Sequence, residues 1–180
     1  MKRESKTPFA ILGILSQCEM NGYEIKQYIQ STIRFFWSES FGQIYPTLKK
    51  LLDEGLIREL EKKQASGKVK KVFKITKLGL KEFKTWMENS MIHSTKRDEL
   101  LFKVFFARHM DKNIFSQQMD LEHRKNLENI ASLKQFKKEL DTEWKTHPDF
   151  KYWNLTLEYS EKQTNLNLEW IEKVKKILVD

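Results

Sequence analysis

Residues 40–55, SFGQIYPTLKKLLDEG, constrain the fold of this chain more than any other stretch. At helical spacing the large apolar residues share one side, which predicts a helix with a buried stripe and an exposed polar face. The apolar side comprises Phe41, Ile44, Leu48, Leu51 and Leu52. The exposed side comprises Gly42, Gln43, Pro46, Lys49, Lys50 and Asp53. Ser40 is suited to cap this helix and Gly55 to end it, and Pro46 predicts a bent or late-starting first turn.

Two short apolar helices are predicted before this stretch. Thr7 caps the first helix and Pro8 follows in its first turn, where a proline needs no amide hydrogen. That helix ends near Gln17, and Asn21 caps the second one. The first helix is predicted to bury Phe9, Ile11, Leu12 and Leu15, and in the second Tyr23, Ile25, Ile29 and Ile33 recur at roughly helical spacing. The aromatic residues after the second helix are also predicted to be core: Phe35, Phe36 and Trp37.

After Gly55 the pattern changes from a helical to a strand period. Residues 56–63 and 69–76 are predicted strands joined by a turn at residues 65–68, and Thr76 caps a further helix. Six lysines fall on this hairpin: Lys62, Lys63, Lys68, Lys70, Lys71 and Lys74. Lysines can simply prevent an edge strand from pairing. Because these follow a candidate recognition helix, a wing that contacts the DNA backbone or minor groove accounts for them better.

The charge of the chain is unevenly placed. The net charge is +8, and residues 1–90 hold 17 Lys and Arg against 10 Asp and Glu, whereas residues 91–180 hold 16 against 15. The basic surplus in the first half favours a phosphate-bearing partner. Cys18, the single cysteine, lies in an apolar segment and is predicted to be a buried thiol. No apolar run of membrane length and no secretory leader is present, so we expect a cytoplasmic protein without a membrane partner.

The second half is predicted to be entirely helical, with residues 1–90 and 91–180 as two domains. A helix over residues 97–110 precedes a break at 111–113, and a long helix from 114 to about 145 is followed by a turn and a last helix. The apolar seams of the two long helices comprise Leu127, Ile130, Leu133, Leu140 and Trp144, and then Trp153, Leu157, Leu168, Ile171, Val174 and Leu178. These seams predict a homodimer interface, and a hairpin within one chain is the alternative.

Residues 8–90 resemble the PadR family of bacterial transcriptional regulators. The resemblance lies in an ordered set of runs: Ile11-Leu12-Gly13-Ile14-Leu15, Asn21-Gly22-Tyr23-Glu24-Ile25, Ile44-Tyr45-Pro46, Gly55-Leu56-Ile57 and Phe73-Lys74-Ile75-Thr76-Lys77-Leu78-Gly79. The helical second half is similar to the C-terminal dimerisation domain of the subfamily that includes virulence-gene activators. The resemblance implies a dimer, usually a repressor, in which Tyr45 and its neighbours approach DNA.

The predicted fold is mainly α with a small β-hairpin: a winged helix-turn-helix domain followed by an all-helical dimerisation domain. The predicted function is sequence-specific regulation of transcription by a homodimer on a two-fold symmetric, double-stranded operator. The predicted DNA contacts are Ser40, Gln43, Tyr45, Pro46, Lys49, Lys50, Lys68, Lys70 and Lys71. The alternative function is a protein-binding adaptor, which would not bind random duplex DNA.

A pocket for a small aromatic effector is one interpretation of four aromatic residues, and ordinary core packing is the other. These residues are Trp86, Phe105, Phe106 and Trp153. An enzyme is disfavoured, because the four histidines lack the spacing of metal ligands and no glycine-rich phosphate loop or nucleophile motif is present. No cofactor is therefore expected.

Overall fold

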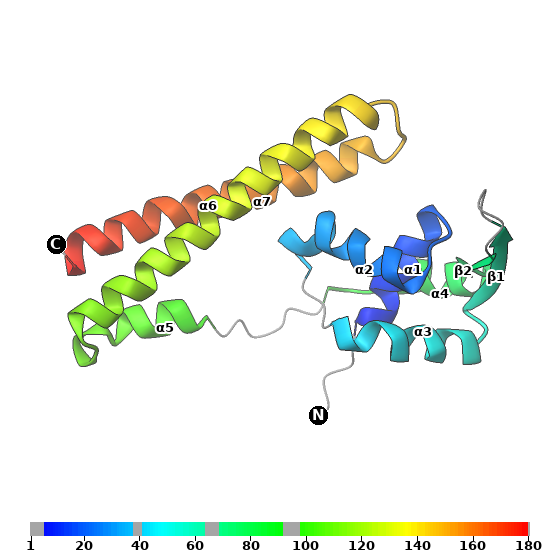
Figure 1. Cartoon of the computed structure of the whole chain (residues 1–180), viewed down its shortest axis with the longest axis horizontal. Coiled ribbons are helices and arrows are strands. Elements are labelled where there is room, and N and C mark those ends of the chain that lie inside the picture. Colours follow the sequence, from blue (N-terminus) through cyan, green and yellow to red (C-terminus); the bar gives the residue numbers. More distant parts are fainter. Residues whose placement is uncertain (1–5, 38–40, 64–68, 92–97, 180) are drawn as a thin grey trace. The chain divides into compact units, whose positions relative to one another are not determined.

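The computed structural model describes residues 6–37, 41–63, 69–91 and 98–179. The chain divides into two compact units, Met1–Ile92 and His93–Asp180 (Figure 1). Both are built mainly from helices, and one two-stranded antiparallel sheet lies in the first unit. The predicted fold class is therefore confirmed. Among the described residues, no helix combines the length and the apolar character that a membrane span requires.

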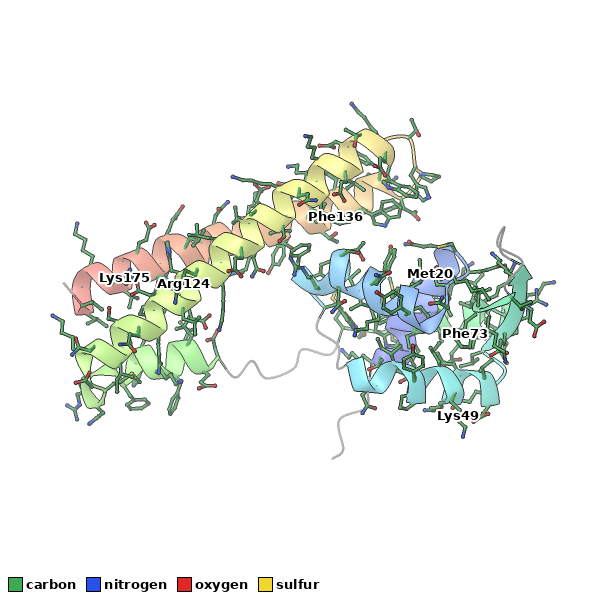
Figure 2. The ribbon with its side chains drawn as sticks, in the orientation of Figure 1. Met20, Lys49, Phe73, Arg124, Phe136 and Lys175 are labelled. Carbon is green, nitrogen blue, oxygen red and sulfur yellow. The ribbon has the colours of Figure 1, made fainter. Side chains whose placement is uncertain are left out.

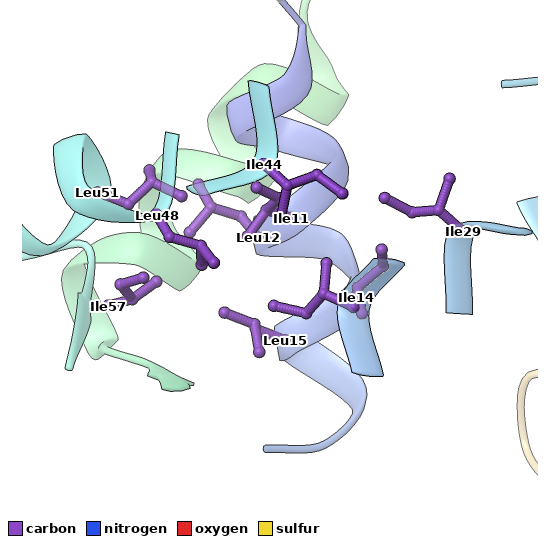
Figure 3. Packing of buried hydrophobic residues seen from close by; sticks show 10 residues of the cluster. Ile11, Leu12, Ile14, Leu15, Ile29, Ile44, Leu48, Leu51 and Ile57 are labelled. Carbon is purple, nitrogen blue, oxygen red and sulfur yellow. The ribbon is translucent and has the colours of Figure 1, made fainter. Parts of the chain in front are cut away.

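The first unit has the element order of a winged helix-turn-helix. Its elements are α1 (Thr7–Gln17), α2 (Gly22–Ser31), η1 (Ile33–Phe35), η2 (Phe41–Gln43), α3 (Ile44–Asp53), β1 (Ile57–Lys63), β2 (Val69–Ile75) and α4 (Lys77–Glu88). The core draws its buried side chains from α1, α2, α3 and β1, and α1 lies at its centre (Figure 3). The two strands pair with Ile57 opposite Ile75 and Lys63 opposite Val69.

Local hydrogen bonds explain where these helices begin. Asn21 accepts a hydrogen bond from the amide of Glu24, and the Glu24 carboxylate accepts one from the amide of Asn21, both at 2.8 Å. This capping box confirms the predicted start of α2. Thr76 caps α4 by accepting a hydrogen bond from Gly79, also as predicted. At α1 the cap position is held by Lys6, and Thr7 is buried in the first turn, so the predicted cap is one residue too late.

The recognition helix α3 starts late, as Pro46 predicted. A 3₁₀ turn, η2, occupies residues 41–43, and α3 begins at Ile44. Pro46 is then the third helical residue, where the backbone amide has no partner within the helix and its loss costs little. Ser40, the predicted cap, lies outside the described residues.

Two predictions of burial in the first unit are wrong, those for Phe36 and Cys18. Phe36 is 49% exposed rather than core. Cys18 is exposed because α1 ends at Gln17 and Cys18 continues as extended backbone at the helix end. Partial burial and the nearby Glu24 carboxylate raise the pKa of the Cys18 thiol.

The second unit is a long helical hairpin with a short helix packed at its open end (Figure 1). Its elements are α5 (Glu99–Phe105), η3 (Ala107–His109), α6 (Lys112–Glu143) and α7 (Phe150–Leu178). Asp111 accepts hydrogen bonds from the amides of Asn113 and Ile114 at 2.9 and 3.1 Å. α6 therefore begins inside the predicted break, because the aspartate at position 111 caps a helix rather than interrupting one. Lys175 of α7 pairs with Asp120 of α6 at 2.5 Å, which ties the two helices together (Figure 2).

Candidate nucleic-acid interface

Helix α3 buries one face and exposes the other. Ile44, Leu48 and Leu51 are at most 2% exposed and pack into the core of the first unit. Tyr45 is 63% exposed, and the other described candidates on this helix and its leading turn are exposed too: Gln43, Pro46, Lys49 and Lys50. Figure 2 shows Lys49 on the side of α3 that is turned away from the rest of its unit. A row of polar side chains is thus presented on a rigid helix, which suits contact with base edges in a major groove.

The ring of Tyr45 lies against the first residue of α2. A Cβ atom placed on Gly22 would lie 2.7 Å from Cε1 of Tyr45 and 3.1 Å from Cζ. Carbon atoms in contact prefer about 3.5–4.0 Å, so a larger residue at position 22 would displace the ring. Gly22 therefore helps to set where the Tyr45 side chain lies. Gly22 was not among the predicted site residues, although the Asn-Gly-Tyr run was a signal for it.

Lys50 is the one candidate on α3 with a described ion pair. Its ammonium lies 3.6 Å from Glu54, one turn further along the helix. Both side chains are largely exposed, at 64% and 45%, and such a pair contributes only about 0.3–0.5 kcal/mol. A phosphate can displace this weak partner, so Lys50 remains available for DNA.

The hairpin lysines are arranged differently from the prediction of a free basic wing. Lys62 and Lys74 both contact Glu19, each at 2.7 Å, and Lys71 contacts Glu59 at 2.8 Å. Lys70 forms an ion pair with Glu24, and only 28% of its side chain is exposed. The predicted contact of Lys70 with DNA stays a prediction, and a phosphate would have to compete with Glu24 for its ammonium. Lys68 lies outside the described residues.

These ion pairs shift the carboxylate titrations. The hydrogen bonds from Lys62 and then from Lys74 lower the pKa of Glu19 to about 2. Burial alone would raise the pKa of Glu24, but the hydrogen bonds from Lys70 and from the Asn21 amide lower it overall. The hydrogen bond to Glu59 raises the pKa of Lys71. The lowered pKa values keep Glu19 and Glu24 ionised at neutral pH, and the raised pKa keeps Lys71 protonated.

Two family profiles cover most of the chain. The profile described as "Transcriptional regulator PadR-like family" matches residues 11–85, which contain α3 and the hairpin. The profile described as "Virulence activator alpha C-term" matches residues 96–179. The chain belongs to the PadR-like family of transcriptional regulators. The predicted resemblance is confirmed, and membership makes the protein a regulator of transcription rather than an enzyme.

This PadR-like regulator is similar to a curated protein of Bacillus subtilis over nearly its whole length. The "Negative transcriptional regulator PadR" of that organism is 29% identical over 171 residues, which are 92% of this chain and 93% of the relative. The structure of B. subtilis PadR with operator DNA matches with a TM-score of 0.78 and 28% identity, over 97% and 99% of the two chains. The structure of B. subtilis PadR with p-coumaric acid has a TM-score of 0.73 and 26% identity, over 100% and 99%.

The aromatic residues predicted for an effector pocket have partners within their own units of this PadR-like protein. Trp86 stacks on Phe9 within the first unit, with ring centroids 4.7 Å apart. Phe105 and Phe106 pack against each other on the short helix α5, and Phe105 is 81% exposed. Trp153 lies at the hairpin turn, where it packs on His147. α5 packs at the opposite end of α6, which is about 48 Å long, so Trp153 and the two phenylalanines cannot line one pocket.

Most residues of the two predicted dimer seams are buried or half-buried within the hairpin of one chain. Five of their residues are at most 7% exposed in a hairpin formed by α6 and α7 of the same protomer: Leu133, Leu140, Leu157, Ile171 and Val174. Their assignment to a dimer interface is wrong, and the alternative of an intramolecular hairpin holds for them. Three others are half-buried, namely Ile130, Trp153 and Leu168. Leu127, Trp144 and Leu178 are 42–48% exposed.

A second apolar stripe runs along α7 of this PadR-like protein, away from the face that packs on α6. Its large side chains are 57–66% exposed: Tyr152, Leu155, Tyr159, Leu166 and Ile177. At about 100° per residue these positions fall within an arc of about 60° on the helical wheel. The stripe is thus distinct from the face of α7 that packs on α6. The second stripe was not predicted, because the residues of the two stripes alternate along the sequence of α7.

Proposed function

We propose that this protein is a repressor that binds a two-fold symmetric operator in duplex DNA as a homodimer. Residues 1–90 serve as the DNA-binding domain and residues 91–180 as the dimerisation domain, in the cytoplasm. The observation that carries the proposal is the division of α3, whose Ile44, Leu48 and Leu51 are buried while Tyr45 and Lys49 face solvent. The similarity to B. subtilis PadR, a negative regulator whose structure was determined with operator DNA, supports it.

In this mechanism α3 of each protomer enters a major groove. Gln43, Tyr45 and Lys49 meet base edges, whereas Lys50 neutralises a phosphate and helps to fix the orientation. Two copies of α3 reach successive major grooves on one face of the duplex when they lie about 34 Å apart. The dimer therefore reads two half-sites related by its own two-fold axis.

The homodimer forms through the exposed stripe on α7, in place of the seams that the sequence suggested. Exposed tyrosine, leucine and isoleucine side chains on one side of a helix favour burial against a partner, and a second copy of the same helix supplies one with matching spacing. Replacing both Leu155 and Tyr159 by aspartate should convert the dimer to a monomer in sedimentation equilibrium. Asn165→Asp is the matched control, because Asn165 is exposed on another side of α7. A double variant that stays dimeric would remove the stripe from the interface.

The DNA-binding proposal is tested by selecting fragments from a random pool with the full-length protein and then titrating the selected duplex. If each protomer covers about four phosphates, the slope of log K against log salt should be near −7 for the dimer. Gln43→Ala should reduce the discrimination between bases at one position of the operator, whereas Lys50→Ala should weaken binding to every sequence alike. Failure to retard any duplex at low salt would instead favour the protein-binding adaptor.

Control by a small aromatic acid is part of the proposal, and it rests on the similarity to B. subtilis PadR, whose structure was also determined with p-coumaric acid. Adding p-coumaric acid, or a related aromatic acid, should release the selected duplex in the same titration. An unchanged affinity across a panel of aromatic acids would restrict the proposal to DNA binding.

A further inference from the structure

The carboxylate of Glu19 is shared by lysines from both strands of the hairpin. One carboxylate oxygen accepts a hydrogen bond from Lys62 of β1, and the other accepts one from Lys74 of β2, both at 2.7 Å. The Glu19 side chain is 20% exposed, whereas the two lysine side chains are 54% and 44% exposed. A single carboxylate thus pairs with two cations of the wing and offsets one of their two positive charges.

Backbone pairing places Glu19 beside the hairpin. Met20, in the connection between α1 and α2, exchanges two hydrogen bonds with Phe73 of β2, at 2.8 and 3.2 Å (Figure 2). The register puts Lys62 opposite Lys70, so that these two lysines and Lys74 share one face of the ribbon. Glu24, in the first turn of α2, forms an ion pair with the third lysine, Lys70. Two carboxylates of the helix-turn-helix therefore hold three lysines on one face of the wing.

We propose that Glu19, assisted by Glu24, limits the strength of sequence-independent DNA binding by occupying wing lysines that would otherwise contact phosphates. A phosphate that approaches Lys62 or Lys74 must compete with the Glu19 carboxylate, whose negative charge offsets part of the lysine charge and repels the phosphate. The inference rests on the proposed DNA-binding function and assigns a role to an acidic residue outside α3. Phosphate contacts carry no sequence information, so Glu19 sets affinity without choosing the operator.

The test is Glu19→Gln in the full-length protein, with binding to a labelled random duplex and to the selected duplex followed by fluorescence anisotropy. Freeing two lysines in each protomer should steepen the log-log salt slope by up to about 3.6 for a dimer. At low salt both duplexes should bind more tightly by at least about tenfold, and the gain should shrink as the salt concentration rises. Unchanged affinity and slope would overturn the inference, and weaker binding would show that Glu19 only positions the wing.

Three comparisons separate the inference from a general effect of charge. Glu88→Gln makes the same change in net charge at an exposed position on α4 and should leave the salt slope nearly unchanged. Glu19→Asp keeps the negative charge on a shorter side chain, so it should give part of the increase in DNA affinity that Glu19→Gln gives. Adding Lys62→Gln and Lys74→Gln to Glu19→Gln should abolish the gain, since the lysines themselves are required. A gain that survives their removal would contradict the proposal.

Titration of the wild-type protein separates a failure of the proposed DNA-binding function from a failure of the proposed role of Glu19. If the wild-type protein binds neither duplex at low salt, the proposed function fails. If the wild-type protein binds and Glu19→Gln changes nothing, the proposed function stands and the role of Glu19 fails. Circular dichroism of each variant confirms that the helical content is retained.

Discussion

Replacing Gly79 by alanine should destabilise the first unit strongly, although alanine is the better helix former. Gly79 is the third residue of α4, and its amide donates to the Thr76 hydroxyl at 3.1 Å. The amide of Thr76 in turn donates to the carbonyl oxygen of Leu56 at 3.0 Å. These bonds join the start of α4 to the segment that links α3 with β1. The junction therefore fixes the recognition helix relative to the wing.

The size of the effect follows from the space at position 79. An alanine Cβ would lie 2.0 Å from the carbonyl oxygen of Leu56 and 2.9 Å from its carbonyl carbon. Both atoms are backbone, so the segments must separate by about 1 Å or more, at a cost of about 2 kcal/mol. Weakening the two hydrogen bonds at the junction costs about 2 kcal/mol more. The higher helix propensity of alanine returns about 1 kcal/mol, which leaves a destabilisation of about 3 kcal/mol.

Urea denaturation of the full-length protein measures this loss. With an m value of about 1 kcal/mol per M, the midpoint of the first unit should fall by about 3 M. Hydrogen exchange read by mass spectrometry should show lost protection in peptides from the first unit and unchanged protection in α6 and α7. Gly13→Ala is the control, because its Cβ would meet only the end of the Phe83 ring at 3.1 Å, and it should be nearly neutral. If Gly79→Ala proved as stable as this control, the argument from the Leu56 carbonyl would be refuted.

Three further outcomes are expected. Asn21→Ala removes the capping box of α2 and should lower the free energy of unfolding, measured in urea, by about 1 kcal/mol. An unchanged free energy of unfolding would mean that the capping box does not contribute to stability. Leu140→Ala leaves a cavity between α6 and α7, where Leu140 is 2% exposed, and should cost about 3 kcal/mol with faster hydrogen exchange in the hairpin. The pKa of Glu19 is lowered from 4.5 to about 2, so its pairs stabilise the fold above about pH 5 and are lost as the pH falls towards 2. The difference in urea midpoint between the wild type and Glu19→Gln should shrink over that interval, and a constant difference would contradict this.

Much of the fold was predictable because its signals are local. A cap such as Asn21 or Thr76 acts on amides within three residues, and the helical period of residues 40–55 reports directly on which side of α3 is buried. The late start of α3 followed from Pro46 alone. The candidate contacts on α3 are exposed for the same reason, since Tyr45 and Lys49 lie opposite the buried stripe.

The wing and the hairpin seams were predicted less well because their partners are distant in sequence. Glu19 and Glu24 lie about 40 to 55 residues from the lysines that they bind, and no local pattern relates them. Along α7, two apolar stripes give one mixed pattern, and periodicity cannot say which stripe packs on α6. Leu157 and Tyr159 are only two residues apart, yet one is 3% and the other 66% exposed.

The sequence by itself determined the order of the elements, the buried face of α3 and the family, because helix periods, caps and motif runs depend on neighbouring residues. Only the tertiary structure decided which lysines of the wing are neutralised and which face of α7 is left uncovered. The physical reason is that an ion pair or a helix contact depends on two segments meeting in space. Folding brings Met20 beside Phe73 and packs α6 along α7, and neither contact can be predicted from the sequence of one segment alone.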